Sequence, residues 1–283
     1  MASFSLFANT PFEFSLLLKI ATFLVLFLII FFFYNFIVSK NDLTFDNSYA
    51  FFIFTIFLSY FLKLTFTYKT LLILLLYILF LRKIYSLRSH RRVLQKLFDS
   101  GFWLSVLFIL EPFTAMFSIL IFTAIYLHQK PIINNLIAPV FGFLAPLIIY
   151  FSYCFWFDEL YVFTNLFYFD EFYSLFFYSK DNFHWIVGLI LALSVISIFL
   201  KSPKAFSVNN SFKKSWILLI IHFIVAVFFS LLIPNKNGTE LLFLLFPTAV
   251  IIANGLEAVN SKFIRNVFII VFLISAFALP FLL

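Results

Sequence analysis

Glu111 is the most unusual of the few residues in this chain that could do chemistry. It lies in the apolar run 102–127 and is followed directly by Pro112. An ionisable group inside a membrane segment is costly and often marks a functional site. Glu111 is therefore either a candidate functional residue or a protonated glutamic acid at a structural break. His222 and Glu257 also lie in apolar runs, where we expect a hydrogen-bonded core histidine and a carboxylate that reaches the interface.

The weaker catalytic candidates are carboxylates in polar segments. Asp158 and Glu159 begin an acidic, aromatic segment, 157–183. Paired carboxylates could bind a divalent cation or serve as a catalytic acid and base. The alternative is a helix that lies flat on the outer leaflet, with its aromatic rings at headgroup level and its acids in water. Asp42 and Asp46 lie in another polar loop, where Asp46 could instead belong to the start of the next helix.

Known chemical motifs are missing from the sequence. It contains no Walker loop, dinucleotide fingerprint, nucleophile elbow or cysteine-based metal spacing. Four scattered histidines do not make a metal site, and the single cysteine, Cys154, cannot form an internal disulfide. We therefore expect no metal and no cofactor. We also expect no nucleic-acid partner, because no basic segment comes with a folded domain to present it.

The composition indicates whether these residues are positioned in a membrane or in a water-soluble domain. Of the 283 residues, 64% are hydrophobic and 11% are charged, with a mean hydropathy of +1.11. A soluble domain has about 25% charged residues, so the chain is predicted to be an integral membrane protein. At about 20 residues per span, we expect an all-α transmembrane bundle of about 8–10 helices in one domain, 1–283. The 49 phenylalanines and five glycines favour bulky, static packing over a transporter.

Apolar runs separated by polar segments predict the individual spans. They are expected over 14–38, 49–66, 70–84, 102–127, 136–156, 184–200, 215–233, 241–258 and 264–283. Proline removes a helical hydrogen bond, so the pair Glu111–Pro112 should break its run into a hairpin of two short half-helices. Asn254 and Gly255 could mark another interruption.

Basic loops beside membrane spans stay in the cytoplasm, and this rule orients the chain. The loops 82–96 and 201–214 are both basic, so both are expected on the cytoplasmic side. The residues that set the orientation in the first loop are Arg82, Lys83, Arg88, Arg91, Arg92 and Lys96. The acidic segment 157–183 then faces the outside, which requires that both ends of the hairpin at Glu111 return to the cytoplasmic side.

Short motifs across the chain carry a resemblance. They are Asn47-Ser48-Tyr49-Ala50, Leu81-Arg82-Lys83 to Leu87-Arg88-Ser89, Phe98-Asp99-Ser100-Gly101-Phe102-Trp103, Gly142-Phe143-Leu144-Ala145-Pro146, and Phe246-Pro247 to Ala253-Asn254. With these, the chain resembles an uncharacterised family of polytopic bacterial inner-membrane proteins. It is also distantly similar to membrane-embedded glycosyltransferases that use lipid-linked sugar donors. That similarity implies catalytic acids in the first external loop, which here would be Asp42 and Asp46.

Three functions remain open on these grounds. The first is a non-enzymatic structural or assembly subunit of a multi-protein bacterial inner-membrane complex, with membrane lipids and other inner-membrane proteins as partners. The second is an enzyme that uses a lipid-linked sugar donor, which predicts that the carboxylates of the two polar segments converge on one external cavity. The third is a small transporter, in which Glu111, His222 and Glu257 would line a common path.

Overall fold

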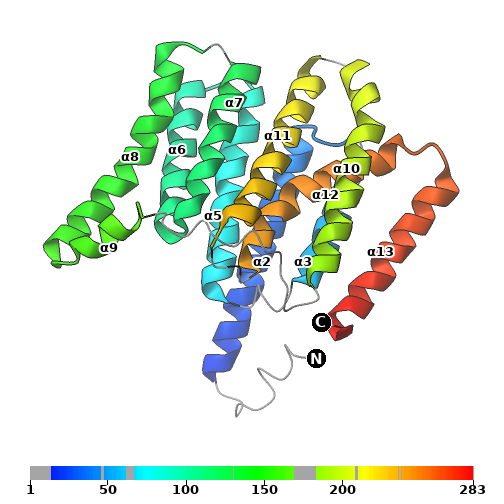
Figure 1. The fold of residues 1–283 in the computed structure, drawn as a ribbon, viewed down its shortest axis with the longest axis horizontal. Coiled ribbons are helices and arrows are strands. Elements are labelled where there is room, and N and C mark those ends of the chain that lie inside the picture. The colour runs from blue at the N-terminus through cyan, green and yellow to red at the C-terminus, as the bar shows by residue number, and fades with distance from the viewer. Residues whose placement is uncertain are drawn as a thin grey trace. The chain divides into compact units, whose positions relative to one another are not determined.

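The computed structural model describes residues 14–45, 48–61, 67–129, 131–168, 183–207, 210–234, 236 and 238–282. Within these ranges every regular element is a helix, as Figure 1 shows, so the all-α prediction is confirmed. Seven of the helices are long and apolar enough to cross a membrane. The helices form two compact units, the first from residues 1–75, 176–208 and 236–283 and the second from 76–175 and 209–235. The single domain over 1–283 stays a prediction.

The first unit is built around a helix that is apolar on every side. Its elements are α2 (Phe14–Lys40), α3 (Tyr49–Tyr60), the first part of α5 (Tyr68–Tyr85), α10 (Phe183–Ser207), η3 (Thr239–Leu241), α12 (Leu242–Ala258) and α13 (Lys262–Leu282). Residues 242–256 of α12 are all buried, mainly against α3 and α10. A helix that is hydrophobic all round must be enclosed by others, which explains this central position.

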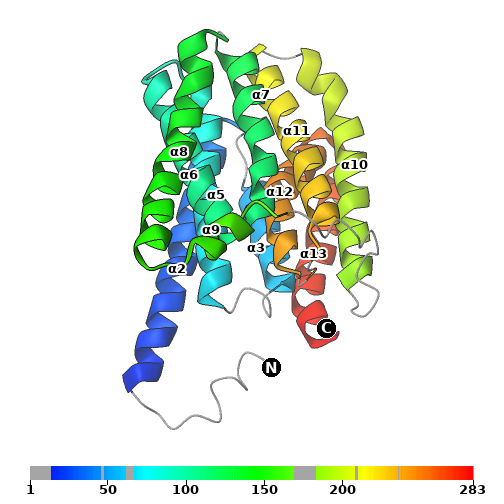
Figure 2. The ribbon, with the colours of Figure 1, turned by 60° about the vertical axis from the view of Figure 1, so that its left-hand side comes forward.

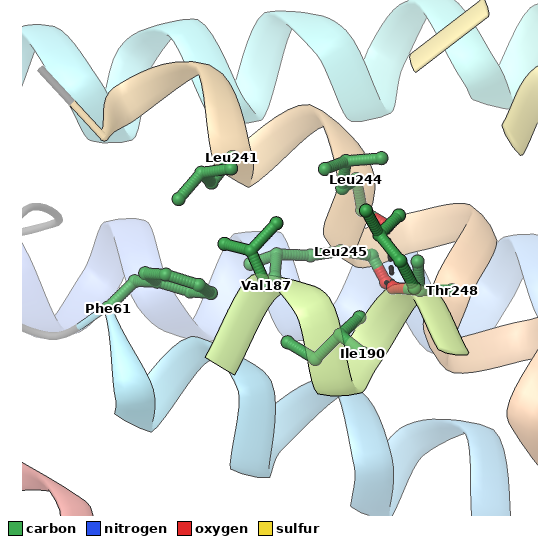
Figure 3. Close-up of a pocket in the computed structure, with 8 residues that line it drawn as sticks. Phe61, Val187, Ile190, Leu241, Leu244, Leu245 and Thr248 are labelled. Carbon is green, nitrogen blue, oxygen red and sulfur yellow. Dashed lines mark hydrogen bonds between the residues drawn. The ribbon is translucent and has the colours of Figure 1, made fainter. Parts of the chain in front are cut away.

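A very small cavity lies where α12 packs against α10. Figure 3 shows this cavity, of about 10 Å³, where Val187 and Ile190 of α10 face Leu244 and Leu245 of α12. About 10–15 Å³ is the least space that holds one water molecule, and a water also needs polar partners. The hydroxyl of Thr248 already donates to the Leu244 carbonyl at 2.6 Å. The cavity is therefore a small packing gap and not a ligand site.

The second unit contains the predicted hairpin. Its elements are the second part of α5, η1 (Ser86–Arg88), α6 (Val93–Leu110), η2 (Pro112–Phe117), α7 (Ser118–His128), α8 (Ile133–Trp156), α9 (Leu160–Asn165) and α11 (Asn210–Leu232). The helix breaks at Glu111, whose backbone is extended, so the break at Glu111–Pro112 is confirmed. In Figures 1 and 2, the connection between α7 and α8 lies at one end of this unit and α9 lies at the other.

The hairpin is longer than predicted. Its first helix begins at Val93 and not near residue 102, because the helix continues back to the left-handed turn at Arg92 (φ 50°). Its 18 residues span about 27 Å, close to the hydrocarbon thickness of about 30 Å. The prediction of two short half-helices is therefore wrong for α6. Its two ends nevertheless lie together, because the Gln129 amide donates to the Leu87 carbonyl at 2.5 Å.

Two further predictions about helix boundaries are wrong. The predicted loop 201–214 is mostly helical, since α10 runs to Ser207 and α11 begins at Asn210. Lys204 and Lys213 are exposed at these ends, because long lysine side chains can reach water from the last turns of a membrane helix, whereas Lys201 is buried. The interruption expected at Asn254–Gly255 is absent, and α12 runs through both residues to Ala258.

Close approach of two backbones joins α6 and α8, which lie side by side in Figures 1 and 2. A β-carbon on Gly101 would collide with the Pro139 carbonyl, and one on Gly142 would collide with the Phe98 carbonyl. Small residues at helix crossings let membrane helices gain van der Waals contact that bulky side chains prevent. Two of the five glycines therefore allow one crossing, each from its own helix.

Candidate functional site

The most strongly polar site in the first unit is an ion pair between two helices. The Lys201 amino group of α10 lies 2.7 Å from the Glu257 carboxylate of α12, and the two side chains are only 4% and 10% exposed. Glu257 is in the last turn of α12, where its carboxylate pairs with Lys201, and its extension to the membrane interface stays a prediction. Taking two charges out of water is costly unless further hydrogen bonds satisfy them.

The loop before α3 supplies the additional contacts. The Phe45 backbone N–H donates to Glu257 Oε1 at 3.0 Å, and the Lys201 Nζ lies 4.4 Å from the centre of the Phe45 ring. The fully buried Asn254 donates through Nδ2 to the Leu43 carbonyl at 2.8 Å. We call Leu43, Phe45, Lys201, Asn254 and Glu257 the Lys201–Glu257 cluster. It fixes a loop, α10 and α12 together.

A second carboxylate, Glu240, lies buried in η3 at the other end of α12. Its burial is not predicted from the sequence, because it follows the polar residues Asn237-Gly238-Thr239, which are typical of a surface turn. Nearby, burial lowers the pKa of the Lys236 amino group below its usual value, and the charge of Glu240 opposes that shift. The two ends of α12 thus each place a carboxylate close to a lysine.

The main polar contact inside the second unit involves His222 of α11. His222 is fully buried, and its Nδ1 lies 2.9 Å from the Tyr85 hydroxyl. Its Nε2 contacts the Tyr77 hydroxyl, and the edge of the Phe117 ring lies beside it. A neutral imidazole has one donor and one acceptor, so one tyrosine donates to it and the other accepts. The two tyrosines are not predicted as partners from the sequence, although their eight-residue spacing places both on one face of α5.

The lysines and arginines of residues 82–96 and 210–214 lie at one end of the second unit, which we call its basic end, and contacts fix several of them. Lys83 pairs with Asp99 at 2.7 Å, and Arg88 Nε donates to Ser211 Oγ at 2.8 Å. Lys96 Nζ donates to the carbonyls of Ser86 and Ser89, which follow the end of α5. These bonds join the residues after α5 to α6 and to the first turn of α11. The exposed Arg91 and Arg92 lie in the turn between η1 and α6, whereas Arg82 is half-buried in α5.

The remaining candidates fall in both units. Glu111 is half-buried at the end of α6 that lies away from the basic residues, and its carbonyl accepts from the Thr114 hydroxyl at 2.7 Å. Asp158 and Glu159 are exposed neighbours after α8 in the second unit. Asp42 is exposed in the first unit, in a left-handed turn (φ 45°). Asp46 and residues 169–182 of the acidic segment fall outside the described residues.

The part of the chain that the structure describes contains no candidate metal site. No group of three or more histidine, cysteine or acidic side chains there could hold a metal ion. The buried Lys201–Glu257 ion pair and the hydrogen bonds of His222 instead connect one helix or loop to another. The arrangement can fix helices against one another, and its charged atoms at the helix ends can contact polar groups outside the bundle.

Apolar helices of this length and number define a multi-pass helical membrane protein. Within that class, residues 2–281 match a family model described as a family of unknown function, DUF6427, and the chain belongs to that family. No curated protein and no solved structure matches the chain.

Proposed function

We propose that this protein is a non-enzymatic structural or assembly subunit of a multi-protein complex in a bacterial inner membrane. The observation that supports it most is the use of the buried polar side chains. His222 joins α11 to α5, and the Lys201–Glu257 cluster joins α10, α12 and a loop. A buried side chain that makes hydrogen bonds to partners on other elements stabilises one arrangement of the helices. A scaffold needs such a single arrangement.

The outer face of α8 is the surface we propose for contact with a partner subunit. Five large side chains follow one another along this helix and are exposed: Phe141, Ile148, Ile149, Phe155 and Trp156. Phe141, Ile148 and Phe155 are seven residues apart, as are Ile149 and Trp156, so each set lies along one face of the helix. Aromatic residues are enriched at the centres of protein interfaces, so this face is suited to another membrane helix as well as to lipid.

A photo-crosslinking amino acid at Ile149 tests the proposal in cells at native expression. Ile149 is 69% exposed, whereas Leu147 in the same helix is buried and provides the matched control. We expect the probe at Ile149 to yield one discrete protein adduct, identified by mass spectrometry, and the probe at Leu147 to yield none. Lipid adducts alone at Ile149 would contradict the subunit role. Co-purification of a polyprenyl lipid with the lone protein would favour the glycosyltransferase-like alternative.

We also propose that the basic end of the second unit, together with the 201–207 end of α10, faces the cytoplasm, because lysine and arginine beside spans remain on that side. Single cysteines in a Cys154→Ala background test this orientation. We expect cysteine at position 161 to react with a membrane-impermeant thiol reagent in intact cells. Cysteines at 91 and 213 should react only after permeabilisation. Reaction of position 91 or 213 in intact cells would show that the orientation is reversed.

A further inference from the structure

Positive charge from three separate segments gathers around one buried histidine in the second unit. His128, the last residue of α7, is 6% exposed. Hydrogen bonds hold basic segments next to it: Arg88 Nε of η1 donates to Ser211 Oγ in the first turn of α11 at 2.8 Å, and His90 Nδ1, in the turn after η1, lies 3.3 Å from Oε1 of Gln129, the residue after His128. Lys214 follows Ser211 by three residues in α11, and the charges of Lys214 and Arg88 both act on His128. Arg88, His90, His128 and Lys214 come from three regions of the sequence, at 88–90, 128 and 214, so the fold itself brings these regions together. We call them the His128 cluster.

The charge at this end of the unit is strongly unbalanced. The lysines and arginines described there are Arg82, Lys83, Arg88, Arg91, Arg92, Lys96, Lys213 and Lys214. Across the described residues from 82 to 100 and from 210 to 214, the one carboxylate is Asp99, and Lys83 already pairs with it. Like charges repel, so bringing them together has a free-energy cost that a bound anion would reverse.

We propose that the His128 cluster binds the phosphate of an anionic membrane lipid. Lysine and arginine make charge-assisted hydrogen bonds to phosphate oxygens, and a basic pocket between membrane helices is suited to an acidic lipid headgroup. The cluster lies at the ends of α5 and α7 and at the start of α11, two of which are long enough to cross a membrane. Those helix ends place it at headgroup level.

An apolar cavity in the same unit favours a lipid over a free phosphate ion. The cavity has a volume of about 290 Å³ and is lined by residues of α6, η2, α7 and α8, including Ser118, Ile121 and Phe122. Phe122 is 45% exposed, so the cavity opens outward. Phe122 is six residues from His128, about 9 Å along α7. An acyl chain could occupy this space, whereas inorganic phosphate has no apolar part to place there.

Native mass spectrometry of the purified protein, titrated with phosphatidylglycerol or phosphatidylcholine, tests the proposal. We expect one phosphatidylglycerol to bind in preference to phosphatidylcholine. Lys214→Gln should weaken that binding about tenfold, the loss expected for one charge-assisted hydrogen bond, while Lys214→Arg should retain it. Lys213→Gln is the matched control: it removes the same charge from the neighbouring position, whose side chain is exposed whereas that of Lys214 is half-buried.

Three results would overturn the proposal. Equal loss in Lys213→Gln and Lys214→Gln would indicate non-specific attraction to a basic surface. Equal binding of the two lipids by the wild-type protein would exclude an anionic preference. Displacement of phosphatidylglycerol by an equal concentration of inorganic phosphate would indicate a site for the free ion. Unchanged thermal unfolding of each variant without lipid confirms folding, and His90→Gln replaces Lys214→Gln if that variant does not fold.

Discussion

Replacing Glu257 by alanine should destabilise the protein by about 3–5 kcal/mol, which is the expected cost of leaving the partner charge of a buried pair uncompensated. The Lys201 side chain is 4% exposed and would lose the carboxylate oxygen 2.7 Å from its Nζ. The Phe45 N–H would lose its acceptor at the same time. The substitution should therefore release the loop before α3 as well as the contact between α10 and α12.

Unfolding of the purified protein in mixed micelles, with increasing denaturing detergent, measures this loss. The matched control is Lys204→Ala, which removes an exposed lysine whose Nζ bonds the Ala258 carbonyl at 3.0 Å. Exposed polar contacts contribute little, so the control should change stability by less than about 1 kcal/mol. A Glu257→Ala effect as small as that of Lys204→Ala would show that the pair is not buried in the folded protein.

A double variant separates charge from packing at this site. Lys201→Met combined with Glu257→Leu removes both charges and keeps comparable apolar volume, a change that is often neutral for a buried pair. We expect most of the stability lost in Glu257→Ala to return. The remaining loss should be about 1–3 kcal/mol, because the Phe45 N–H stays without its carboxylate acceptor. A double variant less stable than Glu257→Ala would argue against a cost arising from the unpaired lysine.

Apolar runs and breakers in the sequence were sufficient to predict the helices and the interruption at Glu111. Runs of this hydropathy can satisfy their backbone groups in a membrane only as helices, and Pro112 cannot continue one. Exact ends were less predictable. Segments that contain several polar residues resemble loop sequence, yet two of them, 201–207 and 93–101, extend α10 and α6. A membrane helix can begin or end in water, so polarity alone does not place its boundaries.

Partner selection between helices could not be predicted from the sequence. In the sequence, Lys201 belongs to the basic loop 201–214 and Glu257 is expected at the interface, and nothing in their spacing of 56 residues connects them. The same holds for His222, whose two tyrosine partners lie on α5, more than 130 residues earlier. Helical periodicity indicates which residues share a face. It does not indicate which helix that face meets.

Introducing a β-carbon at the crossing of α6 and α8 should be the second strongly destabilising change. In Gly142→Ala the new methyl group would overlap the Phe98 carbonyl, and in Gly101→Ala it would overlap the Pro139 carbonyl. Backbone atoms inside a helix cannot rotate away as a flexible side chain can, so the two helices must separate. Overpacking of this kind costs about 1–3 kcal/mol and occasionally more, and the two effects should not add, because both act on the same crossing.

Gly188→Ala is the matched control for this pair, since a β-carbon there meets no atom within 4 Å. Gly188 also lies inside a helix, α10, so the substitution should be neutral or should stabilise the protein by up to about 1 kcal/mol through higher helix propensity. Detergent unfolding of the three variants beside the wild type gives the comparison. If Gly142→Ala were as stable as Gly188→Ala, the helices would have room at their crossing, and α6 and α8 would not approach each other as closely as described. A loss confined to Gly101→Ala and Gly142→Ala would instead locate the cause in the contact of the two backbones.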